Sequence, residues 1–421
     1  MRRHATTIGG PPGPALHSAT VLGLVLIAAG GTFLLSALCT FVVRAWARRR
    51  GFVDRPGGHK QHASPVALGG GIAITAAILV PIVGGTLVAW LLYRGGSVPS
   101  WLPAVVHPHL PGIASKLPVV LVIAGGIVVL HVIGLIDDVR PLGWTPKLIA
   151  QTLVALAVAG PANIRAIEAL PAPLSVILTV LWIVLITNAF NFLDNMDGLS
   201  AGVAAIACAV FAVASAAAGQ VFVPVMAWVG VGAFLGFLVF NFSPATIFMG
   251  DAGSLVIGFF LSVLTILTTY YDAAKDPTPL GVIVPLVVLA VPLYDVTSVV
   301  IYRIRAGQSP FRGDRRHFSH RLVSRGMSVR GAVLTIYLAT AATGLPAIIL
   351  PGLDWAGAGL VLLQCLCVVT MIALLESSTP RPPHPRFPTT TPSSPDHPQR
   401  APATPPNHGG HAHPNNIRGA L

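Results

Sequence analysis

Charged residues are scarce in this sequence. They make up 10% of its 421 residues, against about 25% in a typical soluble domain. Apolar residues make up 54%, and they fall into segments that follow one another without a gap large enough for a soluble domain. This composition excludes an ordinary soluble protein. The pattern predicts one all-α domain, a polytopic helix bundle that crosses a membrane many times.

Three further absences exclude other classes. The four cysteines all lie inside apolar segments, which argues against disulfides and metal-binding thiolates and leaves packing as their role. The pattern GxxxxGK[ST] of an ATP-driven machine is missing. The run that begins at Asp197-Gly198 lacks the arginine of a DGxxAR-type motif, which argues against a CDP-alcohol phosphotransferase.

Basic residues are more numerous than acidic ones, 26 against 14, so the formal net charge is +12. These cations are dispersed among the loops between apolar segments instead of forming one patch. We therefore attribute them to membrane topology and expect no nucleic-acid partner.

The apolar segments predict the number of helices. Crossing a bilayer core takes about 20 apolar residues per helix. On that measure the sequence predicts eleven membrane-spanning helices, with ten as the alternative because the fourth segment is short. The predicted segments are 21–47, 69–92, 118–135, 147–161, 172–190, 199–218, 221–240, 252–270, 280–301, 331–350 and 354–376.

The distribution of cations predicts the orientation. The loops after the odd-numbered helices hold 16 Lys and Arg residues, whereas the loops after the even-numbered helices hold four. Because positively charged loops stay in the cytoplasm, the odd-numbered loops are predicted to be cytoplasmic. Residues 1–20 would then be an extracytoplasmic segment, residues 21–376 the transmembrane domain, and residues 377–421, rich in Pro, Thr, Ser and His, a disordered cytoplasmic tail.

Carboxylates gather at that same predicted face. Eight of them lie in the odd-numbered loops or at the adjoining helix ends, and all eight are aspartate: Asp54, Asp137, Asp138, Asp194, Asp197, Asp251, Asp295 and Asp314. Such groups at membrane helix ends are costly unless they are paired or bind a metal. The short aspartate side chain suits a hard divalent cation held close to the backbone. The cluster therefore predicts a site.

Two loops hold most of these carboxylates. Asp137-Asp138 follows the third helix, and adjacent carboxylates are tolerated when a cation or a proton lies between them. NAFNFLDNMDG follows the fifth helix and places Asn188, Asn191 and Asp194 on one helical face, with Asp197 three residues further.

Two further loops add groups that bind phosphate. In FMGDAGS, Asp251 stands between glycines at a helix start, where a metal can bind and backbone N–H groups can receive phosphate. In DRRHFSH, His317 and His320 lie among arginines, a combination that binds polyanions. Together the loops carry the carboxylates, amides, imidazoles and arginines that a magnesium-assisted reaction of a diphosphate needs.

With Asp137-Asp138, NAFNFLDNMDG, FMGDAGS and DRRHFSH in this order, the sequence resembles the polyprenyl-phosphate N-acetylhexosamine-1-phosphate transferase family (glycosyltransferase family 4) over residues 20–375. The resemblance implies ten or eleven helices in a bacterial plasma membrane and an active site that faces the cytoplasm. It implies that undecaprenyl phosphate attacks the β-phosphorus of a UDP-sugar and that UMP leaves. Mg²⁺, with Mn²⁺ as an alternative, would assist, and a homodimer is an open alternative to a monomer.

The resemblance also implies roles for individual residues. The implied catalytic residues are Asp137, Asp138, Asp194, Asp197, His317 and His320. The implied substrate-binding residues are Lys60, Lys147, Asn188, Phe248, Arg315 and Arg316. The implied metal ligands are Asp251 and Asn191.

Three positions depart from the family pattern. Ser319 stands where the family often has a third histidine, Asn195 replaces a glycine between the two aspartates, and His59 replaces a common arginine. These departures favour the UDP-N-acetylglucosamine branch over the phospho-N-acetylmuramoyl-pentapeptide transferase branch, which is the alternative function. From the sequence we expect Ser319→Ala to stay within about tenfold of wild-type activity, because a hydroxyl is the weaker donor, and Ser319→His to be tolerated.

A secondary transporter is the rival from another class. It would carry its ionisable residues near the middle of broken helices, whereas the middles of the helices predicted here are almost free of charge. For the transferase, the acceptor phosphate is already largely dianionic near pH 7 because its second pKa is about 6. A general base at Asp137 would then contribute less than charge neutralisation and positioning. A covalent aspartyl-phosphate route through Asp138 is an open alternative.

Overall fold

The computed structural model describes residues 23, 25–54, 65–96, 99–100, 102, 104–167, 169–268, 270, 277–309 and 317–377. The chain divides into a unit of residues 1–380 and a separate unit of residues 381–421. The predicted amino-terminal segment and the predicted tail beyond Ser377 lie outside the described residues, and so does the loop that holds Lys60.

The described part of residues 1–380 is almost entirely helical, and it contains eight helices that are long and apolar enough to cross a membrane. They are α2 (Gly31–Arg50, extended by a π-helical turn at Leu26–Gly30), α3 (Gly70–Gly95), α5 (Leu117–Val139), α7 (Ala172–Leu193), α8 (Leu199–Ala217), α9 (Phe222–Asn241), α14 (Val329–Ala347, extended by a 3₁₀ turn at Leu350–Gly352) and α15 (Trp355–Ser377). Two apolar helices are shorter, α6 (Trp144–Ala159) and α10 (Asp251–Leu267). The prediction of an all-α membrane bundle is confirmed, while the number of spans stays a prediction.

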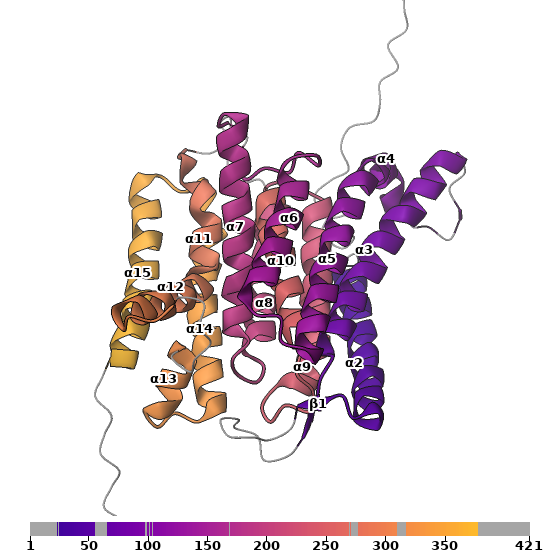
Figure 1. Cartoon of the computed structure of the whole chain (residues 1–421). Helices are drawn as coiled ribbons and strands as arrows, with labels where there is room; N and C mark the ends of the chain where they lie inside the picture. Colours follow the sequence, from indigo (N-terminus) through magenta and orange to yellow (C-terminus); the bar gives the residue numbers. More distant parts are fainter. Residues whose placement is uncertain are drawn as a thin grey trace, which may run out of the picture. The chain divides into compact units, whose positions relative to one another are not determined.

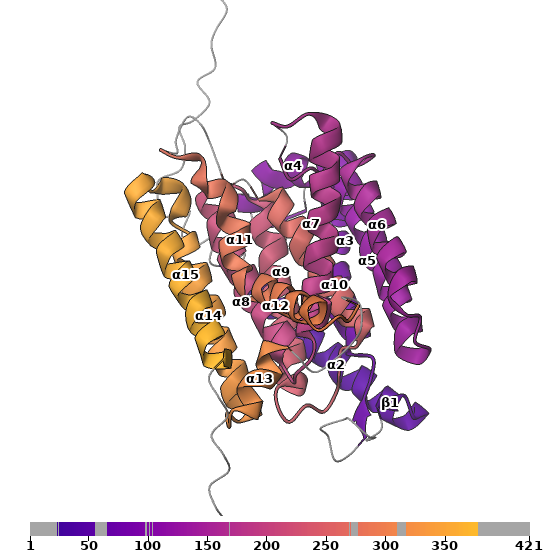
Figure 2. The same cartoon turned by 60° about the vertical axis from the view of Figure 1, so that its left-hand side comes forward.

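The span predicted at 280–301 is helical but bent. A 3₁₀ turn (Pro279–Ile283) leads into α11 (Val284–Val288), and α12 (Ala290–Arg305) follows at an angle of 65°. The break falls at Leu289 (φ −95°, ψ 17°), and Pro292 cannot donate the backbone hydrogen bond that a continuous helix would need there. Both views show α12 lying across the neighbouring helices (Figures 1 and 2).

Helix α10 lies inside the bundle. Fourteen of its 17 residues are buried, and it packs against α3, α5, α7 and α8 (Figure 1). The amino-terminal turn of α10 touches two neighbours where they lack a side chain. A Cβ atom on Gly134 of α5 would lie 2.4 Å from the Ala252 nitrogen, and one on Gly71 of α3 would lie 2.4 Å from the Gly253 nitrogen. These glycines allow the start of α10 to lie against both helices.

The outer helices present apolar side chains to the surroundings. Leu34 on α2, Leu338 on α14 and Leu360 on α15 are among many large apolar residues that are more than half exposed. A soluble monomer does not expose so much contiguous apolar surface. The chain is therefore a multi-pass membrane protein. The four cysteines are free thiols, as the sequence predicted.

The described parts of the loops after the odd-numbered predicted helices meet at one end of the bundle, as expected. There β1 (Val53–Asp54) pairs with β2 (Val66–Ala67) in an antiparallel hairpin. The Phe248 nitrogen donates to the Ala67 carbonyl at 2.8 Å, and the Gly70 nitrogen donates to the Phe248 carbonyl at 2.9 Å. The remaining short helices are α4 (Leu110–Ser115) and α13 (Phe318–Ser324). A 3₁₀ turn at Ala104–His109 precedes α4.

Candidate active site

The site is organised by the start of α10. Gly250, with φ at +68°, turns the chain into this helix, and a Cβ atom there would lie 2.3 Å from a carboxylate oxygen of Asp138. Asp138, at the end of α5, accepts hydrogen bonds from the backbone nitrogens of Asp251 (2.8 Å) and Ala252 (3.3 Å). It therefore satisfies two of the N–H groups that every helix leaves without an internal partner. Without it these donors would lose their acceptor, at a cost of about 1–3 kcal/mol each.

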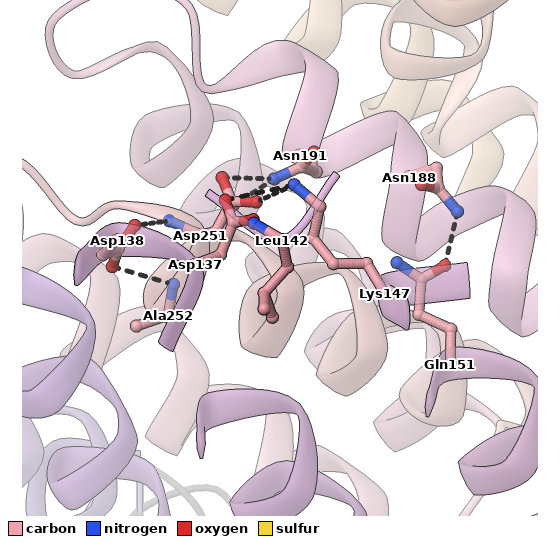
Figure 3. Close-up of polar contacts among 10 residues, drawn as sticks. Asp137, Asp138, Leu142, Lys147, Gln151, Asn188, Asn191, Asp251 and Ala252 are labelled. Atoms are coloured by element: carbon pink, nitrogen blue, oxygen red, sulfur yellow. Dashed lines mark hydrogen bonds and ion pairs between the residues drawn. The ribbon is translucent and has the colours of Figure 1, made fainter. Parts of the chain in front are cut away.

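Lys147 joins two carboxylates from different helices. Its Nζ atom, on α6, lies 2.7 Å from Asp251 Oδ2 and 3.2 Å from Asp137 Oδ2 (Figure 3). The other oxygen of Asp137 accepts from the Leu142 backbone nitrogen at 2.8 Å, which holds the turn between α5 and α6. The three charged side chains keep 16–24% of their surface exposed, so an anionic substrate can reach them.

The asparagines on α7 contact different partners. Asn191 Nδ2 donates to Asp251 Oδ1 at 3.0 Å and to Ser254 Oγ at 2.9 Å, so it orients the carboxylate. Asn188, about one turn earlier, donates to Gln151 Oε1 on α6 and to the Val184 carbonyl. Figure 3 shows this second pair beside the carboxylate cluster and apart from it. Asn188 and Asn191 were predicted to share one helical face, but Asn188 contacts α6 whereas Asn191 contacts α10.

Asp194 and Asp197 lie in the turn between α7 and α8. Helix α7 ends at Leu193 and Asp194 is its C-cap (φ −78°, ψ 49°), so the helical spacing expected for Asp194 is not continued. Asp197 Oδ2 accepts from the Ala245 backbone nitrogen at 2.9 Å. Buried Asn241 connects the same two loops, because it accepts from the Gly198 nitrogen at 3.1 Å and donates to the Ile247 carbonyl at 2.9 Å.

Negative charge is concentrated around Asp194. Burial raises the pKa of its carboxyl well above the usual range, and three neighbouring carboxylates raise it further: Asp251, Asp138 and Asp197. Lys147 supplies one positive charge against this group. A divalent cation bound here would relieve the repulsion and favour the ionised form of Asp194.

The residues present fit a hard cation such as Mg²⁺. Carboxylate and amide oxygens are its preferred ligands, and in proteins it is often bound by one or two carboxylates together with water and substrate phosphates. Within the described ranges, no group of three or more His, Cys, Asp or Glu side chains is placed to hold a metal ion. Asn191 holds Asp251 through its amide nitrogen, so its predicted role as a ligand stays a prediction.

The histidine segment lies beside this cluster. His317 is the N-cap residue of α13, and its Nδ1 atom lies 2.9 Å from Asp295 Oδ2 on α12. The Phe318 nitrogen donates to the other oxygen of Asp295 at 3.2 Å. The His317 ring packs edge-to-face against Phe192 of α7, with 5.8 Å between centroids, and His320 lies 6.5 Å from His317 on the same measure.

Sequence reasoning placed Asp295 among the acidic residues but gave it no role in the site. It is fully buried, with 0% of its surface exposed, and it orients His317. The bend between α11 and α12 sets the course of the helix that carries Asp295. Pro292 is a local signal for that bend, but the prediction of one helix at 280–301 did not take it into account. Asn241 was missed for a different reason, because its two partners belong to different loops.

Asp295→Asn is expected to lower turnover about tenfold while leaving the fold intact. An asparagine can still accept from the Phe318 nitrogen through its Oδ1 atom, but it then presents a donor Nδ2 group to His317 Nδ1 in place of a carboxylate oxygen, so the imidazole loses its anchor. The measurement is kcat and KM of the purified variant and wild type, with the thermal unfolding of both. Equal kcat values would show that Asp295 only supports α13.

Not every predicted residue can be placed. Lys60, Asp314, Arg315 and Arg316 lie outside the described residues. Phe248 contributes backbone hydrogen bonds beside β2, and its predicted contact with substrate stays a prediction. The other predicted residues all lie at the end of the bundle described above.

Known proteins resemble this chain over most of its length. Residues 120–269 match the family model described as Glycosyl transferase family 4. The probable undecaprenyl-phosphate N-acetylglucosaminyl 1-phosphate transferase of Bacillus subtilis is 32% identical over 315 residues, which cover 73% of this chain and 79% of the relative. The decaprenyl-phosphate N-acetylglucosaminephosphotransferase of Mycolicibacterium smegmatis is 33% identical over 334 residues, which cover 72% and 78%. This chain belongs to glycosyl transferase family 4.

The undecaprenyl-phosphate alpha-N-acetylglucosaminyl 1-phosphate transferase of Escherichia coli is 28% identical over 323 residues, which cover 73% of this chain and 79% of the relative. Membership makes the chain a glycosyl phosphotransferase. The family 4 match contains Asp137, Asp194 and Asp251, whereas His317 lies beyond it. The structure joins the two regions through the contact between Phe192 and His317.

Proposed function

We propose that this membrane enzyme transfers N-acetylhexosamine-1-phosphate from a UDP-sugar to undecaprenyl phosphate, with release of UMP, and so initiates assembly of a cell-envelope polysaccharide. One observation carries the proposal. Carboxylates from α5 and α10, Lys147 from α6 and Asn191 from α7 make one connected cluster beside an imidazole-bearing segment. The named relatives act on a polyprenyl phosphate and N-acetylglucosamine, which supports both substrates.

Charge neutralisation and positioning would perform the reaction. The proposed Mg²⁺, or Mn²⁺, would be bound by Asp251, with Asp194 and Asn191 beside it, and would offset the charge of the diphosphate oxygens. His317 and His320 would donate hydrogen bonds to the diphosphate as charge builds up on it. Lys147, now shared between two carboxylates, would attract the acceptor phosphate.

Asp138 is better suited to shaping the site than to forming a covalent intermediate. Both of its oxygens accept hydrogen bonds from the start of α10. A phosphoryl group on either oxygen would displace one of these bonds. This favours direct attack by the acceptor phosphate on the β-phosphorus of the donor.

Two alternative functions are a muramoyl-pentapeptide donor for the same reaction and a secondary transporter. The relatives with N-acetylglucosamine in their names favour that donor over a muramoyl-pentapeptide donor. A secondary transporter would carry charges near the middle of its helices; α11 and α12 are indeed broken, but the carboxylate–lysine cluster lies at helix ends.

The test is a direct assay. Purified enzyme in detergent is incubated with undecaprenyl phosphate, Mg²⁺ and, in separate reactions, UDP-N-acetylglucosamine, UDP-N-acetylgalactosamine and UDP-N-acetylmuramoyl-pentapeptide. The expected result is a lipid-linked product and an equal amount of UMP with an N-acetylhexosamine donor. Product from the pentapeptide donor alone would assign the alternative branch, and no product from any donor would contradict the proposal.

Orientation can be tested independently, since UDP-sugars are cytoplasmic. Ser324 on α13 and Ser115 on α4 are exposed, and these two helices lie near opposite ends of the bundle (Figures 1 and 2). In a background without the native cysteines, Ser115→Cys is expected to react with an impermeant thiol reagent in intact cells, and Ser324→Cys only after permeabilisation. The reverse labelling would place the site outside the cytoplasm.

A further inference from the structure

Two polar side chains from segments far apart in the sequence contact each other beside the candidate site. Ser319 Oγ, on α13, donates a hydrogen bond to Asn195 Oδ1, in the turn after α7, at 2.6 Å. The two residues are 124 positions apart in the chain. Asn195 is one residue from Asp194 and two from Asp197, and Ser319 lies between His317 and His320. The bond therefore joins the carboxylate turn to the histidine segment.

The direction of this hydrogen bond follows from its surroundings. Asn195 Nδ2 donates to the Phe192 carbonyl at 2.7 Å, so the amide oxygen is the atom that faces Ser319. The Ser319 hydroxyl must then be the donor. Ser319 has 0% of its surface exposed, so its hydroxyl is not directed toward a substrate. Full burial of Ser319 and its bond to Asn195 argue against both expectations from the sequence, that Ser319→His is tolerated and that Ser319→Ala stays within about tenfold of wild type.

A second contact holds the histidine segment beside the bond between Asn195 and Ser319. The ring of His317 packs against Phe192, the residue whose carbonyl anchors the Asn195 amide. On its other side His317 is held by Asp295 of α12. The histidine segment is thus fixed from α12 through Asp295 and from the end of α7 through Phe192 and Asn195.

We infer that Asn195 and Ser319 form a positioning pair, which sets the place of the His317–His320 segment relative to the carboxylates across the site. This inference rests on the proposed function, since it assumes that imidazoles and carboxylates act on the same diphosphate. Neither residue contacts substrate in this role. Asn195 and Ser319 act through the segments that they hold, and each depends on the other.

Loss of the pair is expected to change turnover more than substrate binding. Either Asn195→Ala or Ser319→Ala removes the one bond between the two side chains, so the imidazoles lose their alignment. Misplacement of catalytic groups by about 1 Å can lower the rate about 100-fold, and we expect kcat to fall about 10- to 100-fold with KM for the UDP-sugar changed less than about threefold. Because both changes remove the same interaction, the double variant is expected to be no slower than the slower single variant.

The experiment is a double-mutant cycle on the purified full-length enzyme, with Ser324→Ala as the matched control. Ser324 lies on the same short helix, but it is exposed and its hydroxyl donates to the Arg321 carbonyl. The control is expected to keep wild-type kcat. The exchange variant Asn195→Ser/Ser319→Asn retains the summed side-chain volume and both hydrogen-bonding groups, and it is expected to recover part of the lost kcat.

Three results would overturn the inference: multiplied losses in the double variant, a change in KM without a change in kcat, or no difference between Ser319→Ala and Ser324→Ala. Thermal unfolding of every variant is measured beside the kinetics. If Ser319→Ala does not fold, Ser319→Cys, which is similar in size but a weak donor, takes its place in the cycle. Failure of the wild type to use any UDP-sugar would contradict the proposed function, whereas an active wild type with independent single effects would contradict only this inference.

Discussion

Asp251→Asn is expected to lower turnover at least ~100-fold, because it removes the charge to which the proposed metal ion would bind. The same change weakens the contact with Lys147, now 2.7 Å from Asp251 Oδ2. Asparagine is nearly isosteric, and the backbone nitrogen at this position can still donate to Asp138. The start of α10 should therefore be retained. The measurement is the initial rate of lipid-linked product formation at saturating substrates and fixed free Mg²⁺.

The control is the same substitution at another helix start. Asp354 precedes α15 and accepts from the Gly357 nitrogen at 2.8 Å in an exposed position. Asparagine caps helices about as well as aspartate, so Asp354→Asn is expected to retain wild-type activity. Near-normal activity of Asp251→Asn in buffer whose divalent ions are controlled with EDTA would remove Asp251 from the metal site.

His317→Ala and His320→Ala are each expected to lower turnover about 10²–10³-fold, the typical cost of removing one donor to a developing anion. For His317 the geometry adds a reason. Its Nδ1 atom is engaged by Asp295 and its ring by Phe192, so the imidazole is held before the substrate binds. Preorganised donors stabilise a transition state without a further cost of reorganisation. The loss should therefore appear in kcat, measured at saturating UDP-sugar.

His107→Ala serves as the comparison, since this histidine lies in the 3₁₀ turn before α4, where it contacts the Leu102 carbonyl. It is expected to leave turnover unchanged. The competing interpretation of the histidine segment is a basic stretch that binds anionic lipid headgroups, with about 1 kcal/mol for each charge. If His317→Ala and His320→Ala retained most of the activity while they extracted normally, that interpretation would hold. The diphosphate-binding groups would then have to be sought elsewhere.

Apolar segment length accounts for what could be predicted of the fold. A bilayer imposes a minimum length on each helix, so helices occur at every predicted position, including the short one at 144–159. The exception is the segment at 280–301, which is mostly apolar in sequence and contains Pro285 and Pro292, and which bends at Leu289. A proline such as Pro292 can also be accommodated within a continuous helix, so whether the helix breaks there depends on the surrounding packing.

The chemical groups of the candidate site could also be predicted from the sequence, but their contacts could not. The loops alternate between the two ends of a bundle, so the aspartates at positions 137, 194 and 251 had to meet at one end. Periodicity then placed Asn188 beside Asn191, whereas packing directs Asn188 to Gln151 and Asn191 to Asp251. Helical spacing describes one helix and does not determine what lies opposite each residue.

The sequence by itself determined that this is a membrane-spanning helical enzyme with its acidic and imidazole groups at one end. Apolar length, charge distribution and four ordered motifs are local properties, and each can be read without knowing how helices pack. The tertiary structure decided how those groups are used. It assigned Asp138 to the start of α10, 113 residues further along the chain, Asp295 to His317, and Asn195 to Ser319. Hydrogen bonds between residues so far apart depend on the packing of whole helices, so no segment of the sequence contains them.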